Sequence, residues 1–172
     1  AGDAIQVNGI VKYAGGNLIP DGDFDLGAAG WTDGVDNPIS ESPYFSVFPV
    51  GGIDGGAYLH ARNQKDAIVL NAEGLKFVAD LETGRNYYFS MALLGGNVFH
   101  RLQLTGDTSG QAKGDSTAFT LKTNSTWVRQ EAGFNAGTYS QARFSATQMS
   151  GKSQFDKVIL CPLFDTKEEA FA

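Results

Sequence analysis

Cysteine, basic residues and long apolar runs are all scarce in this sequence, and each shortage excludes a class of protein. The single cysteine, Cys161, cannot form a disulfide within the chain, so the fold does not depend on oxidation. Residues 1–60 hold eight acids and one base, Lys12, and the chain carries a net charge of −6. We expect no broad basic face for nucleic acid. No apolar run is long enough to cross a bilayer, so we expect no membrane insertion.

Residue types that carry catalysis are also few. Two histidines, His60 and His100, and one cysteine provide neither a zinc-ligand cluster nor a recognisable nucleophile signature. The glycines between Gly51 and Gly56 lack the lysine and the helix that complete a phosphate-binding loop. Carboxylate pairs for glycoside hydrolysis converge only in the fold, so sequence spacing does not decide about them. We predict a protein without catalytic residues.

Glycine and alternating apolar residues are abundant. The chain has 172 residues, enough for one domain with a full core, and 22 of them are glycine. Apolar residues recur with a period of two in short runs separated by glycine-rich turns, and helical periodicity is confined to residues 166–170. The runs span residues 5–13, 75–81, 87–93, 98–104, 142–146 and 158–160. This pattern predicts an all-β antiparallel sandwich or barrel. Cys161, at the end of one run, is predicted to be buried.

Three motifs, in order, carry a resemblance to a known family. Residues 17–32 read NLIPDGDFDLGAAGWT, residues 81–91 read LETGRNYYFSM, and residues 155–160 read FDKVIL. The three motifs resemble the opening, a middle strand and the closing strand of carbohydrate-binding modules of the family 4, 9 and 22 type. The resemblance implies a galactose-binding-like jelly roll: an all-β sandwich of two antiparallel sheets over residues 17–164. Residues 1–16 would be a preceding strand or linker, and residues 165–172 a tail.

The same resemblance implies a structural Ca²⁺. Matched by position, its ligands would be the side chains of Asp25 and Asp156, with backbone oxygens near Asp23 and Gly56. Alternating acids beside a glycine turn suit a hard cation, which needs several oxygen ligands. The alternative is a solvated acidic turn in which aspartates cap the local backbone. The chain departs from the family at Lys157, where a second acid is usual.

Strand alternation locates a candidate ligand face. If His100, Leu102 and Leu104 point inward, then their neighbours point outward, and the same reasoning applies to the other strands. Aromatic faces and planar polar groups suit sugar rings and hydroxyls. The predicted ligand residues are Trp127, Tyr139, Tyr88, Arg101, Gln103, Arg129, Gln141 and Arg143. The alternative is an ordinary polar sheet face. Ala92 stands where the family often has a sugar-stacking aromatic residue.

Two further aromatic features have structural and functional interpretations. The segment 37–56 contains Phe45, Val47 and Phe48, which either form a second contact for sugar or protein, or form a strand with Phe45 and Val47 facing the core. We favour the strand. Trp31 is predicted to pack inside the sandwich or at its rim.

The sequence thus predicts a non-catalytic carbohydrate-binding module that recognises a polysaccharide or oligosaccharide. We expect a secreted or cell-surface location, in company with other domains of a larger glycan-utilisation protein. The alternative is a structural or adhesive sandwich whose exposed face meets protein, because one fold serves many functions.

Overall fold

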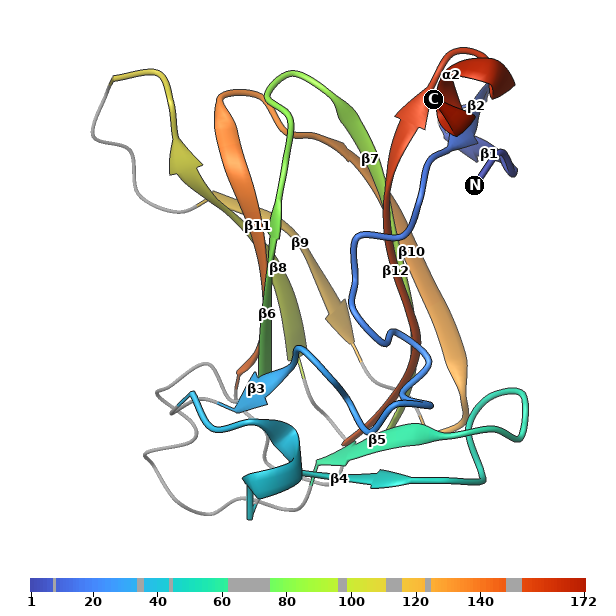
Figure 1. Ribbon diagram of the computed structural model, residues 1–172, viewed down its shortest axis with the longest axis vertical. Helices are drawn as coiled ribbons and strands as arrows, with labels where there is room; N and C mark the ends of the chain where they lie inside the picture. The colour runs from blue at the N-terminus through green and yellow to red at the C-terminus, as the bar shows by residue number, and fades with distance from the viewer. Residues whose placement is uncertain are drawn as a thin grey trace.

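Two antiparallel sheets make up the protein (Figure 1). The structure, a computed structural model, describes residues 1–7, 9–33, 36–43, 45–61, 75–95, 99–110, 116–122, 125–147 and 153–172. The first sheet has five strands in the order β3 (Thr32–Asp33), β6 (Leu75–Asp80), β11 (Tyr139–Thr147), β8 (Phe99–Asp107) and β9 (Ser116–Lys122). The predicted all-β sandwich of two antiparallel sheets is confirmed. Val98, expected in the fourth run, lies outside the described residues.

The second sheet is organised around its longest strand. β12 (Ser153–Phe164) pairs with β7 (Asn86–Gly95), and β7 pairs in turn with β10 (Val128–Asn135). Other strands join the two ends of β12. At its beginning lie β5 (Tyr58–Ala61) and β4 (Phe45–Phe48), and at its end lie β2 (Ile10–Ala14) and β1 (Ala4–Val7).

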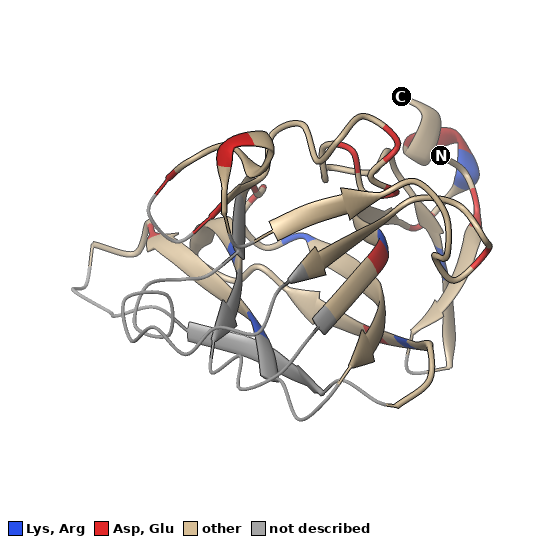
Figure 2. Ribbon diagram, turned by 90° about the horizontal axis from the view of Figure 1, so that it is seen from below, with Lys and Arg blue, Asp and Glu red and all other residues tan. Residues whose placement is uncertain are grey.

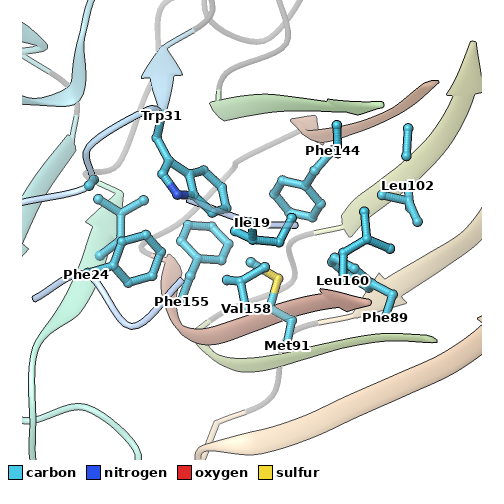
Figure 3. Packing of buried hydrophobic residues seen from close by; sticks show 14 of the residues in the cluster. Ile19, Phe24, Trp31, Phe89, Met91, Leu102, Phe144, Phe155, Val158 and Leu160 are labelled. Atoms are coloured by element: carbon cyan, nitrogen blue, oxygen red, sulfur yellow. The ribbon is translucent and has the colours of Figure 1, made fainter. Parts of the chain in front are cut away.

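The core fills the space between the sheets because alternate residues of each strand point inward. Phe89 from β7 and Phe144 from β11 are fully buried, with ring centroids 6.2 Å apart, so the two sheets meet there. Figure 3 shows further apolar side chains, such as Met91 and Leu102, pointing into the same space. Burying each side chain of this size contributes about 1.5–3 kcal/mol.

Trp31 closes one side of this core. Its side chain is 1% exposed, and its ring lies 5.4 Å from Phe24 and 6.3 Å from Phe144. The indole Nε1 donates a hydrogen bond to the Pro20 carbonyl at 2.7 Å, so the polar atom of the ring is satisfied. The structural interpretation of Trp31 is confirmed.

The two ends of the chain lie close together beside the second sheet (Figure 1). The β1–β2 hairpin extends that sheet through β2, and the short helix α2 (Lys167–Phe171) packs against β2 and β12. Thr166 and Glu169 form a capping box at the start of α2. A 3-10 turn, η1 (Ile39–Glu41), precedes β4. Residues 1–16 and 165–172 therefore both contact the sandwich.

Burial governs the chemistry of the single cysteine. Cys161 is 2% exposed, as predicted, and burial raises the pKa of its thiol to about 11. The thiol therefore stays protonated and unreactive at neutral pH. Among the described residues, no helix has both the length and the apolar character needed to span a bilayer.

Candidate functional site

The eight predicted ligand residues fall on two different sheets. Arg101 and Gln103 lie on β8, and Gln141 and Arg143 lie on β11, its neighbour in the five-stranded sheet. Tyr88 lies on β7 and Arg129 on β10, in the other sheet. These strand groups stand on opposite sides of the core in Figure 1. The eight residues therefore do not share one ligand face, as the sequence analysis expected, because alternation fixes the side of a strand but not its sheet.

The outward side of the five-stranded sheet, here called the polar face, brings four of these residues together. The alternating residues Leu102, Leu104, Ala142 and Phe144 are buried, so the residues between them point away from the core. Strand pairing places Arg143 opposite Gln103, and its Nη2 donates to Gln103 Oε1 at 3.2 Å. Among the residues whose side chains the structure describes, the polar face comprises Val78, Asp80, Arg101, Gln103, Thr105, Asp107, Gln141 and Arg143.

The edge of the polar face on β6 is formed by an apolar and an acidic residue. Val78 pairs with Arg143 and is 55% exposed. Asp80 pairs with Gln141, and its Oδ1 accepts a hydrogen bond from Gln141 Nε2 at 3.2 Å. Planar amide and guanidinium groups therefore alternate with an exposed apolar residue, a combination that suits a sugar ring and its hydroxyls.

Charge on the polar face is divided between its two ends. Its two described acids, Asp80 and Asp107, lie toward the beginning of β11. Arg101 is paired with Ser145 at the other end of that strand. Asp107 Oδ1 accepts from the Ser109 amide at 2.8 Å, so this acid also stabilises the turn that follows β8. The arginine end and the acidic end of the face are thus chemically distinct.

Tyr139 begins β11 but does not belong to the exposed row. It is half-buried and packs against the core cluster. It sits opposite Asp107, at the end of the strand where the alternation gives way to a turn. Paired residues share one side of a sheet, so Tyr139 leaves the backbone on the side of Asp107, but its half-buried ring packs against the core cluster.

Arg129 and Tyr88 hold the outer surface of the second sheet together. Arg129 Nη1 donates to the Ser90 hydroxyl and, at 3.3 Å, to the Lys157 carbonyl, and Ser90 is fully buried beneath it. The Tyr88 hydroxyl donates to the Glu131 carboxylate. Burial, and next the bond to Glu131, raise the pKa of Tyr88. Both predicted ligand residues therefore make structural contacts with neighbouring strands.

Trp127 precedes β10 and joins an aromatic cluster that sequence reasoning missed. Its Nε1 donates to the Gly51 carbonyl at 3.3 Å, and its ring meets Tyr58 edge-on at 5.9 Å. Tyr58 stacks on Phe48 at 5.4 Å and 15°. Tyr58 and Phe48 are paired across β5 and β4, a contact that only the strand register reveals. Phe45 in β4 is buried, which confirms the strand interpretation of this segment.

Asp156 is buried and already satisfied by backbone donors. Its side chain is fully shielded, its Oδ1 accepts from the Lys157 amide at 2.7 Å, and its Oδ2 accepts from the Ile53 amide at 2.9 Å. Burial raises the pKa of this carboxyl, although the two hydrogen bonds oppose that rise. Lys157 Nζ lies 3.1 Å from Asp54, so a cation and a second acid stand beside the site. Asp156 thereby fastens the loop around Ile53 to β12.

The other proposed metal ligands are only partly assembled. Gly56 and Asp156 both lie against Gly52, whose amide donates to the Gly56 carbonyl at 2.9 Å. Asp23 lines a shallow pocket of about 250 Å³ beside Lys157, whereas Asp25 is exposed. Nowhere in the described parts of the chain do three metal-ligating side chains come together. Each oxygen of Asp156 accepts one backbone hydrogen bond and has a second lone pair, so these bonds do not exclude Ca²⁺, and the calcium site stays a prediction.

Asp21, in the same acidic turn, caps the backbone. Its carboxylate accepts from the amides of Leu26, Ala28 and Ala29 at 3.0, 2.7 and 3.2 Å. This is the behaviour of the alternative interpretation, in which aspartates of the turn satisfy local N–H groups.

Comparisons with known proteins give structural likeness without sequence likeness. No protein-family profile matches the chain, and no curated protein matches it. A "Family 16 Carbohydrate Binding Module-2" superposes with a TM-score of 0.60 at 14% identity, covering 84% of this chain and 99% of that one. The CBM22-1 xylan-binding domain of Paenibacillus barcinonensis Xyn10C gives 0.61 at 12% identity, with 88% and 97% covered. The K1 cleaved adhesin domain of Lys-gingipain from Porphyromonas gingivalis W83 gives 0.51 at 14%, with 80% and 94% covered. The chain therefore has the jelly-roll sandwich fold that carbohydrate-binding modules share.

Proposed function

We propose that this protein is a non-catalytic carbohydrate-binding module whose ligand lies across the polar face. The observation that carries the proposal is the convergence of Arg101, Gln103, Gln141 and Arg143 on one side of the five-stranded sheet. The fold likeness to a family 16 module and to a xylan-binding domain supports the ligand class. An adhesin domain has the same fold, so the fold does not decide the function, and the proposal depends on the residues of the polar face.

The polar face has the chemistry of reversible sugar binding. Amide groups both donate and accept, and guanidinium groups donate in a plane, so together they pair with hydroxyls arranged around a ring. Val78 offers an exposed apolar surface to the C–H side of that ring. Binding by hydrogen bonds and apolar contact needs no covalent step. The proposed function is therefore binding, with modest affinity for each sugar unit.

The setting of such a module follows from its ligand. A domain that binds polysaccharide without altering it acts by holding an attached partner near the polymer. We propose a secreted or cell-surface location and attachment to further domains of a glycan-utilisation protein. Both proposals depend on the sugar-binding assignment.

Affinity electrophoresis tests the function directly. Native gels containing β-glucan, xylan, mannan, galactan or an acidic polysaccharide should show retardation by at least one polymer. The double variant Gln103→Ala/Gln141→Ala should lose that retardation, because both amides leave the face while both arginines remain. Arg129→Gln on the opposite sheet is the control and should stay retarded. No retardation on any gel, together with self-association in solution, would replace the proposal with the adhesive alternative.

The calcium prediction is a separate proposal with its own test. It is supported by the proximity of Gly56 to Asp156 and opposed by the ammonium group of Lys157, which already pairs with the acid Asp54 beside the site. Thermal melts in excess EGTA and in about 5 mM CaCl₂, a concentration ample for a structural site, show whether calcium binds. A Tm that is higher with calcium supports the site, and an identical Tm ends the prediction.

A further inference from the structure

We propose that the polar face selects an anionic saccharide, whose carboxylate or sulfate group is bound at the arginine end by Arg101 and Arg143. This inference rests on the proposed function and narrows its ligand class. It starts from the placement of the two arginines relative to each other and to the acids of the same face.

The register makes the arginines near neighbours. Arg143 lies opposite Gln103, and Arg101 is two residues from Gln103 on the same strand. Residues in this diagonal relation on one side of a sheet are about 7–8 Å apart, within joint reach of one ligand group. Both side chains are only partly buried, so the pair can approach a ligand from the sheet surface.

Arg101 has unused hydrogen-bonding capacity. Its Nε is buried and meets no acceptor within the structure as described. Because Nε is shielded, a ligand on the sheet surface would meet the terminal Nη groups of this guanidinium instead. A guanidinium presents parallel N–H groups in a fixed fork that match the two oxygens of a carboxylate or of a sulfate. The group that satisfies Arg101 best is therefore an oxyanion.

The acids of the face lie where they do not neutralise Arg101. Asp80 is engaged by Gln141, and Asp107 by the Ser109 amide, both toward the opposite end of the face. Lys12, Arg85 and Lys157 form ion pairs on the other sheet and its loops. In Figure 2, acidic segments occur in many loops and near both termini, whereas basic segments are few. Two arginines side by side on one face are thus an exception in a chain of net charge −6.

The net charge sets the kind of attraction. A chain of charge −6 repels an acidic polymer at long range, so binding must come from short-range contact with the arginine end. The contact then depends on the guanidinium fork as well as on positive charge. Asp80 and Asp107 repel the anionic group from the other end, which gives the ligand one direction along β11.

The experiment compares matched ligands that differ only in charge. Native gels first rank polygalacturonate, alginate, glucuronoxylan, carrageenan and chondroitin sulfate against neutral galactan, xylan, glucan and mannan. Isothermal titration then compares the preferred acidic oligosaccharide with its methyl-esterified or desulfated form. We expect at least a tenfold weaker Kd for the uncharged form. Preference for carboxylated polymers assigns uronic acids, and preference for sulfated ones assigns sulfate esters.

Variants connect the preference to the two arginines. Arg101→Gln/Arg143→Gln should bind charged and uncharged forms equally, and Arg101→Lys/Arg143→Lys should lie in between because the fork is lost while the charge remains. Arg129→Gln, an identical substitution on the opposite sheet, should keep the preference. Stronger binding of the neutral forms, unchanged in the double glutamine variant, would overturn this inference and leave the proposed function standing. Absence of binding to every polymer would overturn both.

Discussion

Arginines on the two outward surfaces of the sandwich have opposite roles. On the second sheet, Arg129 donates hydrogen bonds to the Ser90 hydroxyl and the Lys157 carbonyl, and it lies over the buried Ser90 of β7. On the polar face, the Nε of Arg101 has no acceptor in the described structure, and Arg143 donates a hydrogen bond to Gln103. The residue type is the same, but the surroundings make one arginine structural and place the others on the face that we propose binds the ligand.

The difference comes from what covers each sheet. The loop that contains Gly51 and Ile53 lies over the second sheet, where it is held by Trp127 and by Asp156. The partners of Arg129 lie within its own sheet, Ser90 on β7 and Lys157 on β12, so neighbouring strands there supply the contacts that a ligand would otherwise supply. On the polar face, we propose that a saccharide supplies such contacts.

The largest expected effect is the loss of the carboxylate that holds this loop. Asp156→Ala leaves the Ile53 and Lys157 amides without their acceptor in a buried setting. Each unsatisfied group costs about 1–3 kcal/mol, so we expect a loss of about 3 kcal/mol in the free energy of unfolding. Urea denaturation measures it. Saccharide affinity should be unchanged, since the polar face lies on the other sheet, and a loss of binding in a folded variant would contradict the comparison.

Asp156 should also leave a signature in the pH dependence of stability. Its pKa in the folded state is raised above the ordinary value of 3.8, mainly by burial, so the folded state holds this proton more tightly than the unfolded state. Its contribution is therefore most favourable at low pH and is lost as the pH rises from about 4 through the raised pKa. Asp156→Asn removes this titration. The free energy of unfolding is measured between pH 3 and 7 for the wild type and for Asp156→Asn. The wild-type curve should fall more steeply near the raised pKa and run parallel to the variant's curve above it. Curves that are parallel over the whole range would contradict the assignment.

The sequence predicted the sandwich well because its evidence was local. Alternation along β8 and β11 identified Arg101, Gln103, Gln141 and Arg143 as outward, and the structure places them together. The same rule put Tyr88 and Arg129 outward but could not say that β7 and β10 belong to the other sheet. It also missed the pairing of Phe48 with Tyr58, because cross-strand register depends on contacts distant in the sequence. Asp25 was matched by motif position, yet its exposure depends on how the whole turn folds.

The aromatic cluster of Phe48, Tyr58 and Trp127 offers the next test of the comparison. Trp127→Ala removes an indole that contacts Tyr58 and donates to the Gly51 carbonyl. Since the ring is half-buried, we expect about half the cost of a core Trp→Ala change, roughly 2 kcal/mol. Thermal unfolding should show the loss while gel retardation persists. Retardation that disappears with the protein still folded would move the ligand to the second sheet.

A smaller difference in the free energy of unfolding should distinguish Arg129 from Arg101. Arg129→Gln removes the donor that serves the buried Ser90 hydroxyl, so it should cost about 1 kcal/mol. Arg101→Gln removes a side chain that has no such partner and should change the free energy of unfolding by less than about 0.5 kcal/mol. Chemical denaturation of both variants, side by side, measures the difference. Equal losses would mean that Arg101 is as structural as Arg129.

The smallest expected effect is a gain on the polar face. Val78 is exposed on β6 opposite Arg143, and among the described side chains of this face none is aromatic. Val78→Trp would add a flat apolar surface beside the guanidinium group, and tryptophan is well tolerated in strands. We expect affinity for the preferred saccharide to rise by about 1 kcal/mol, roughly fivefold in Kd. Phe48→Trp on the second sheet is the matched control, and titration should show no change there. A gain at Phe48 and none at Val78 would reverse the assignment of the two surfaces.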